Sequence, residues 1–82
     1  MTLKESFDKC NSWHQRCIII ETYHLLKTFN NRDWKVRDTA NYFGISMGQC
    51  SENLNLAFAL KQDESLKELS RNKALKRLRA NE

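Results

Sequence analysis

Apolar side chains recur at helical spacing along most of the chain, and the clearest stretch covers residues 13–29. One stripe in this segment follows the repeat of a single helix face, and it consists of Ile18, Ile19, Leu25, Leu26 and Phe29. We therefore predict one long helix in the first half of the chain.

Capping residues and turn formers predict shorter helices on both sides of this segment. Thr2 and Glu5 have the spacing of a capping box, which favours a short helix near the start of the chain. Residues 30–33 are rich in turn formers, and Gly44 suits the left-handed end of the helix that follows them. Two further helices are expected to begin after the capping residues Ser46 and Asp63, and a last helix after Ser70 or Asn72. The pattern predicts an all-α, small helix-turn-helix domain of about five helices over residues 1–82.

Composition supports this fold and limits the class of protein. The 82 residues suffice for one small domain, and they include no proline and only two glycines. Three cysteines are an odd number with no disulfide framework, so we expect reduced thiols in a cytoplasmic protein. No apolar run is long enough to cross a bilayer, so no membrane partner is expected.

The long helix is more broadly apolar than a helix in so small a protein needs for its own core. Trp13, Cys17 and Ile20 widen its apolar sector beyond the first stripe. We interpret these three residues as a homodimer interface; the alternative is a central helix surrounded by the others.

Residues 36–56 fit two short helices that cross at a steep angle with a three-residue turn between them. Ala40 supplies a small side chain where the helices approach, and Gly44 tolerates a positive φ in the turn. Apolar side chains on both sides of the turn can pack together; they are Phe43, Ile45, Cys50 and Leu54. The segment therefore predicts a helix-turn-helix.

The Thr39-Ala40-x-x-Phe43-Gly44-Ile45-Ser46 core resembles the helix-turn-helix of bacterial and phage regulators. The continuation through Leu54-Asn55-Leu56-Ala57 is closer to the helix-turn-helix of ParB-type partition proteins and their plasmid and phage relatives. This resemblance covers about a quarter of the chain strongly and implies DNA binding. It does not imply nucleotide binding, because the ParB nucleotide-binding domain has no counterpart in this sequence.

The first turns of the second helix carry mostly short polar side chains, which allow close approach to base edges in the major groove. The base-reading candidates are Ser46, Met47, Gly48, Gln49, Ser51, Glu52 and Asn53. No Lys or Arg occurs from Asp38 to Leu60, so phosphate contacts must come from the flanks. The phosphate-binding candidates are Arg32, Lys35, Arg37, Thr39, Arg71, Lys73, Lys76 and Arg77, the last four in a basic C-terminal helix over residues 70–80.

Nothing in the sequence favours an enzyme, because it contains neither a glycine-rich phosphate loop nor a nucleophile elbow. Cys10, His14, Cys17 and His24 lie on one stretch of helical spacing, but four ligands on one straight helix cannot surround a zinc ion. We therefore expect no metal and no cofactor.

The sequence favours sequence-specific binding of double-stranded DNA by a dimer. The resemblance and the small size imply a phage or mobile-element transcriptional regulator in the cytoplasm of a bacterial host cell. Two alternatives remain open at this stage. One is a DNA packaging or partition adaptor, such as the small subunit of a phage terminase. The other is a phage-encoded protein-interaction module that inhibits a host protein, and the absence of Lys and Arg from the second helix favours this alternative.

Overall fold

The computed structural model describes residues 2–80, and its secondary structure is entirely helical over that range. The elements in chain order are α1 (Leu3–Lys9), α2 (Trp13–Asn30), α3 (Val36–Phe43), α4 (Met47–Gln62), the 3-10 helix η1 (Glu64–Glu68) and α5 (Arg71–Ala80). The prediction of an all-α fold of about five helices is confirmed.

Local capping signals mark where three of these helices begin. Thr2 Oγ1 accepts a hydrogen bond from the Glu5 backbone N–H at 3.1 Å, which caps α1. Asp63 Oδ1 accepts from the Ser65 N–H at 3.1 Å at the start of η1, and Ser70 Oγ accepts from the Lys73 N–H at 3.3 Å at the start of α5. These bonds satisfy backbone donors that a helix leaves unpaired at its N-terminus.

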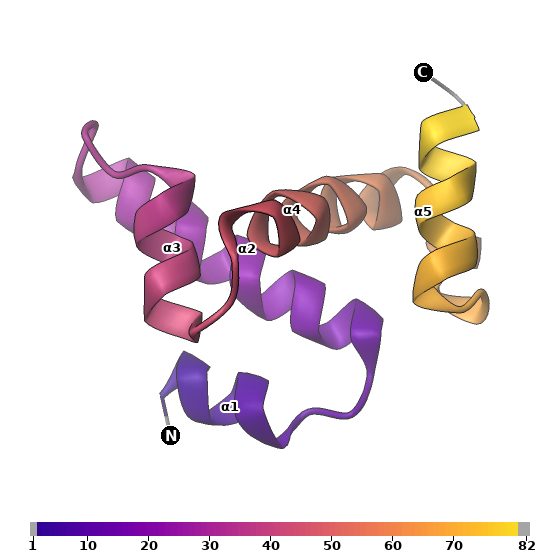
Figure 1. Ribbon diagram of the computed structural model, residues 1–82, viewed down its shortest axis with the longest axis horizontal. Coiled ribbons are helices and arrows are strands. Elements are labelled where there is room, and N and C mark those ends of the chain that lie inside the picture. The colour runs from indigo at the N-terminus through magenta and orange to yellow at the C-terminus, as the bar shows by residue number, and fades with distance from the viewer. Residues whose placement is uncertain (1, 81–82) are drawn as a thin grey trace.

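The two longest helices, α2 and α4, pack against each other along much of their length and form the centre of the molecule. Helices α1 and α3 pack near one end of this pair, and α5 stands across the other end (Figure 1). Helix α3 therefore packs against the start of α4, whereas the basic C-terminal helix α5 contacts the middle of α4, from Glu52 to Ala57.

The interior consists of two groups of buried side chains. The first, which we call the aromatic cluster, lies beneath α3 and the start of α4; it comprises Phe7, Ile20, Tyr23, Ala40, Phe43, Cys50 and Leu54. The second, which we call the tail cluster, joins α5 to α2 and α4; it comprises Cys17, Leu56, Ala57, Ala74 and Leu75, with Trp13 packed against it. The aromatic cluster therefore supports the helix-turn-helix, and the tail cluster holds α5.

The proposed dimer interface at Trp13, Cys17 and Ile20 is wrong. Cys17 and Ile20 are 1% and 0% exposed, because the inward face of α2 contributes them to the chain's own two clusters. The Trp13 indole N–H donates to the Leu69 carbonyl oxygen at 2.9 Å and so links α2 to the segment that precedes α5. The apolar stripe of α2 faces outward instead, where Ile18, Leu25, Leu26 and Phe29 are exposed.

Candidate nucleic-acid interface

A glycine turn joins α3 to α4 in the geometry that the sequence predicted. Gly44 has φ 71° and ψ 33°, in the left-handed region that favours glycine. Its N–H donates to the Asn41 carbonyl oxygen at 3.3 Å, and the Ile45 N–H donates to the Ala40 carbonyl oxygen at 3.1 Å. These bonds close the end of α3 and direct the chain into α4.

Ser46 begins α4 with a reciprocal capping box. Its Oγ accepts from the Gln49 N–H at 3.1 Å, while Gln49 Oε1 accepts from the Ser46 N–H at 3.4 Å. Ala40, Phe43, Cys50 and Leu54 are all buried on the inner side of the two helices, as the sequence predicted. The start of α4 is therefore held firmly against the aromatic cluster.

Most of the predicted base-reading side chains form an exposed surface at the start of α4. Ser46, Met47, Gly48, Gln49 and Ser51 are all exposed, and Met47 retains 59% of its surface. This group, which we call the α4 surface, carries no charged side chain. It presents hydroxyls, an amide and a thioether to solvent.

The prediction that Asn53 reads a base edge is wrong. Asn53 is only 9% exposed, because its position on α4 turns it inward toward α2 and α5. Its Oδ1 accepts from Arg71 Nη2 at 2.9 Å and from Cys17 Sγ at 3.6 Å. Burial raises the pKa of the Cys17 thiol to about 11, so the thiol stays protonated and can donate this bond.

Glu52 occupies the boundary between α4 and α5 rather than an open reading position. Its carboxylate pairs with Arg71 at 3.5 Å and with Arg79 at 3.1 Å, and its side chain is 35% exposed. Two of the arginines on α5 therefore lie against α4, and a base edge would have to compete with them for the Glu52 carboxylate.

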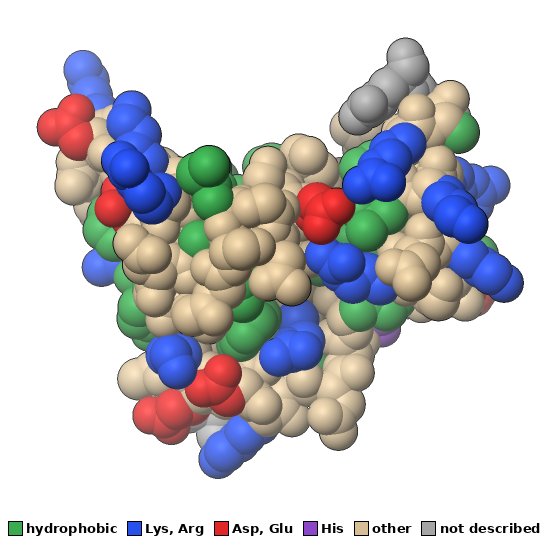
Figure 2. Space-filling view, in the orientation of Figure 1, with side chains coloured by type: hydrophobic (Ala, Val, Ile, Leu, Met, Phe, Trp, Pro, Cys, Tyr) green, Lys and Arg blue, Asp and Glu red, His purple; other side chains and the backbone are tan. Residues whose placement is uncertain are grey.

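The predicted phosphate-binding side chains fall into two exposed groups at opposite sides of the α4 surface. Arg32, Lys35 and Arg37 are exposed in and just after the loop that precedes α3. Lys73, Lys76 and Arg77 are exposed on α5. Figure 2 shows Lys and Arg side chains over both of these regions, with a largely uncharged surface between them.

Thr39 was expected to contact phosphate, and this prediction is wrong because the residue is 0% exposed. Its hydroxyl oxygen accepts from the Trp34 indole N–H at 2.8 Å and lies 2.6 Å from His24 Nδ1. Since the indole can only donate, the Thr39 hydroxyl proton is free to be donated to a neutral His24. Burial lowers the pKa of His24, which favours this neutral form.

Arg16 is a basic residue of this region that sequence reasoning missed. It lies on α2 between Trp13 and Cys17, and its guanidinium carbon sits 4.3 Å from the centre of the Phe7 ring. A signal was present: Arg16 is three residues after Trp13 and four before Ile20, so it borders the buried side of α2.

No family model, curated protein or solved structure matches the chain significantly. Within residues 2–80, no three His, Cys, Asp or Glu side chains are placed to hold a metal ion together. Over the same range, no helix combines the length and apolar character needed to cross a membrane.

Proposed function

We propose that the protein binds double-stranded DNA through its helix-turn-helix, with the α4 surface entering the major groove. The observation that carries this proposal is the exposed, uncharged α4 surface, which a left-handed glycine turn and a capping box present between two basic regions (Figure 2). Short polar side chains at a helix N-terminus suit contacts to base edges, and flanking Lys and Arg suit contacts to phosphates.

The basic regions have a separate role from the α4 surface in this proposal. The group before α3 and the group on α5 supply affinity that depends on salt, because each phosphate contact releases counterions. The α4 surface supplies sequence preference. Because the α4 surface has no charged side chain, one copy of the chain has few phosphate contacts. We therefore propose that two copies act together on a two-fold DNA site.

The exposed stripe of α2 is the surface that we assign to this dimer. Phe29 is 89% exposed, and Ile18, Leu25 and Leu26 lie on the same face. Lys61, at the far end of α4 from Ser46, lines the same hollow as this stripe. Pairing through it therefore leaves the α4 surface free. Leu26→Lys is expected to yield monomers in sedimentation analysis, whereas a wild-type chain that is already monomeric at high concentration contradicts the assignment.

Selection from a random pool of duplex DNA, followed by a salt titration, tests the proposed function. We expect an enriched sequence and an affinity that falls steeply with salt. Gln49→Ala or Ser51→Ala should change the preferred sequence, whereas Arg37→Ala should weaken binding to all sequences alike. If no sequence is enriched and no duplex binds at low salt, the proposal fails.

The same exposed stripe of α2 also suits a protein-interaction module, which is the second candidate function. An apolar surface of this kind on a small chain is typical of a protein contact. Tight binding to a host protein, by a chain that has no affinity for DNA, would favour this candidate over DNA binding.

For the DNA-binding protein, the more specific role that we propose is regulation of transcription.

A further inference from the structure

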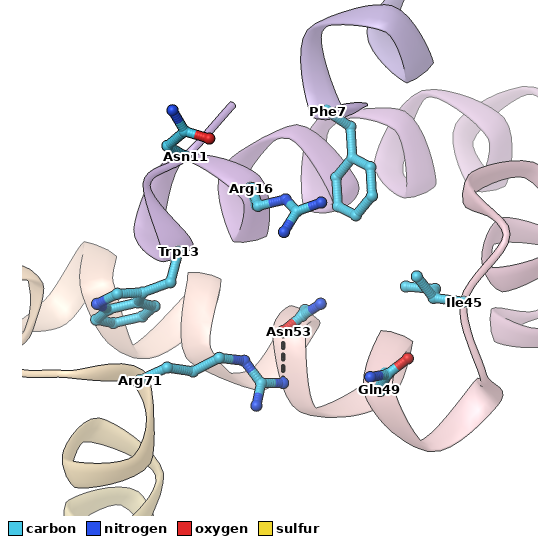
Figure 3. A pocket seen from close by; sticks show the side chains of 8 residues that line it. All are labelled: Phe7, Asn11, Trp13, Arg16, Ile45, Gln49, Asn53 and Arg71. Carbon is cyan, nitrogen blue, oxygen red and sulfur yellow. Dashed lines mark hydrogen bonds between the residues drawn. The ribbon is translucent and has the colours of Figure 1, made fainter. Parts of the chain in front are cut away.

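An open groove of about 420 Å³ lies between the start of α2, the end of α1 and the inner edge of the α4 surface. Arg16 and Arg71 both line it, and its lining includes no acidic side chain. Gln49 and Asn53 from α4 line it as well, so the groove touches the predicted reading helix (Figure 3). Tertiary packing thus brings positive charge to a helix whose own sequence has none nearby.

Arg16 has unused hydrogen-bonding capacity in this groove. Its guanidinium lies over the Phe7 ring, and it forms no ion pair with any residue from 2 to 80. Its Nε is buried without a hydrogen-bond partner over the same range. An unpaired buried donor costs free energy, and Arg16 lines the groove, where its guanidinium can donate to a ligand.

The opposite wall presents further donors. Arg71 is held in place by the Asn53 amide oxygen at 2.9 Å and more loosely by the Glu52 carboxylate at 3.5 Å. The amide oxygens of Asn53 and Gln49 both accept bonds from the chain, to Arg71 and to the Ser46 N–H. Their amide nitrogens are therefore the groups left to face a ligand, and both can only donate.

A groove lined by two guanidiniums and by the amides of Asn11, Gln49 and Asn53 favours a ligand that accepts hydrogen bonds. A phosphate oxyanion meets this requirement, and a guanidinium can bind it through two parallel N–H bonds. We propose that the groove binds a backbone phosphodiester of DNA, with Arg16 and Arg71 on either side of it. This inference rests on the proposed function. Gln49 belongs both to the groove and to the α4 surface, so a phosphate in the groove would be the phosphate contact closest to the bases.

The first test is the salt dependence of DNA affinity for wild type and Arg16→Gln. Loss of one phosphate contact should reduce the slope of log affinity against log salt by about 1. Lys67→Gln is the matched control, because Lys67 is exposed on η1 outside this groove and loses the same charge. An Arg16→Gln slope equal to wild type, with DNA still bound, overturns the inference and leaves the proposed function standing.

The second test uses inorganic phosphate as the probe and the side-chain amide NMR signals of Gln49 and Asn53 as the readout. We expect phosphate to shift both signals in wild type and neither in Arg16→Gln. Gln49→Glu provides a variant that keeps the capping box, since Glu is also favoured at that position, but places a negative charge in the groove. It should abolish the phosphate-induced shift of the Asn53 signal.

These two tests separate the source of the phosphate. Arg16-dependent shifts together with an Arg16-dependent salt slope support a DNA phosphodiester in the groove. Arg16-dependent shifts in a chain that binds no DNA overturn both the DNA source and the proposed function, and identify a site for free phosphate. Signals that do not move with phosphate in folded wild-type protein overturn the groove as a phosphate site.

Discussion

The aromatic cluster and the tail cluster hold two different parts of the molecule with different kinds of packing. In the aromatic cluster, Phe43 lies 5.0 Å from Phe7 and 5.3 Å from Tyr23 between ring centres, and Tyr23 stacks on Tyr42 at 4.0 Å. The tail cluster has smaller side chains, and only Ala74 and Leu75 represent α5 in it. The polar contacts of Trp13, Arg71 and Arg79 supplement this packing.

This difference in packing predicts a division of rigidity, in which the helix-turn-helix is more rigid than α5. Large aromatic side chains bury more apolar area and add favourable ring geometry, so the helix-turn-helix rests on the more stable part of the core. Helix α5 depends on fewer buried atoms and on partly exposed ion pairs, which contribute little. We therefore expect α5 to open at a lower free energy than α3 and α4.

Phe43→Ala should give the largest loss of stability, because it removes an aromatic side chain that three other rings contact. The expected decrease in the free energy of unfolding is about 3–5 kcal/mol. Chemical denaturation followed by circular dichroism measures it. A loss below about 1 kcal/mol would show that the aromatic cluster does not support the fold as described.

Leu75→Ala should have a smaller and more local effect. We expect a loss of about 2 kcal/mol, at the lower end for a buried leucine, because α5 can detach while the rest stays folded. Amide hydrogen exchange should accelerate in α5 and remain slow in α3 and α4. Lys73→Ala, at an exposed position of the same helix, is the control. Equal acceleration in all of the helices would contradict the division of rigidity.

The two glycines should respond to alanine in opposite directions. A Cβ at either position meets no atom within 4 Å, so backbone conformation alone decides the outcome. Gly44→Ala should destabilise the protein by about 1 kcal/mol because of its positive φ, whereas Gly48→Ala, inside α4, should stabilise it by about 0.5–1 kcal/mol. Thermal denaturation of the two variants measures the contrast, and effects of the same sign would contradict this account.

Acid should weaken the attachment of α3 to α2 through His24. This effect on stability is expected to be the smallest of the four that we predict. Burial lowers the pKa of His24 in the folded protein below its ordinary value of 6.5. The unfolded chain therefore takes up a proton at higher pH than the folded chain does. The contribution of neutral His24 to the free energy of unfolding is complete above pH 6.5. It is lost as the pH falls through the lowered pKa of His24 in the folded protein.

Denaturation between pH 7 and pH 5 tests this sign, with His24→Gln as the comparison. Wild type should lose more stability on acidification than the variant, because the variant lacks the group that titrates. A variant with the same pH dependence as wild type would show that His24 does not contribute to it.

Local signals in the sequence were enough to predict the turn and most of the helix ends; the N-cap of α3 is an exception, because Lys35 occupies it. Gly44, Ser46 and Asp63 act on backbone groups within four residues, so their roles do not depend on distant partners. The faces of the helices were harder to predict. A broadly apolar α2 offers two possible inward faces, and the choice is made by how α4 packs against it.

Polar residues were misread where partners distant in sequence bury them. Thr39 meets His24 from α2, and Asn53 meets Arg71 from α5; neither contact has a local sequence signal. Glu21 is also buried, paired with Lys61 on α4, although a glutamate in a helix normally predicts a solvent-exposed position. The groove between Arg16 and Arg71 depends on tertiary packing in the same way.

The most direct test of DNA binding through α4 is an NMR titration of the isotope-labelled protein with a short duplex at low salt. The account predicts backbone shifts at Ser46–Ser51 and in residues 32–37, with smaller shifts on the exposed side of α5. Shifts confined to the exposed stripe of α2, or no shifts at any duplex concentration, would contradict it.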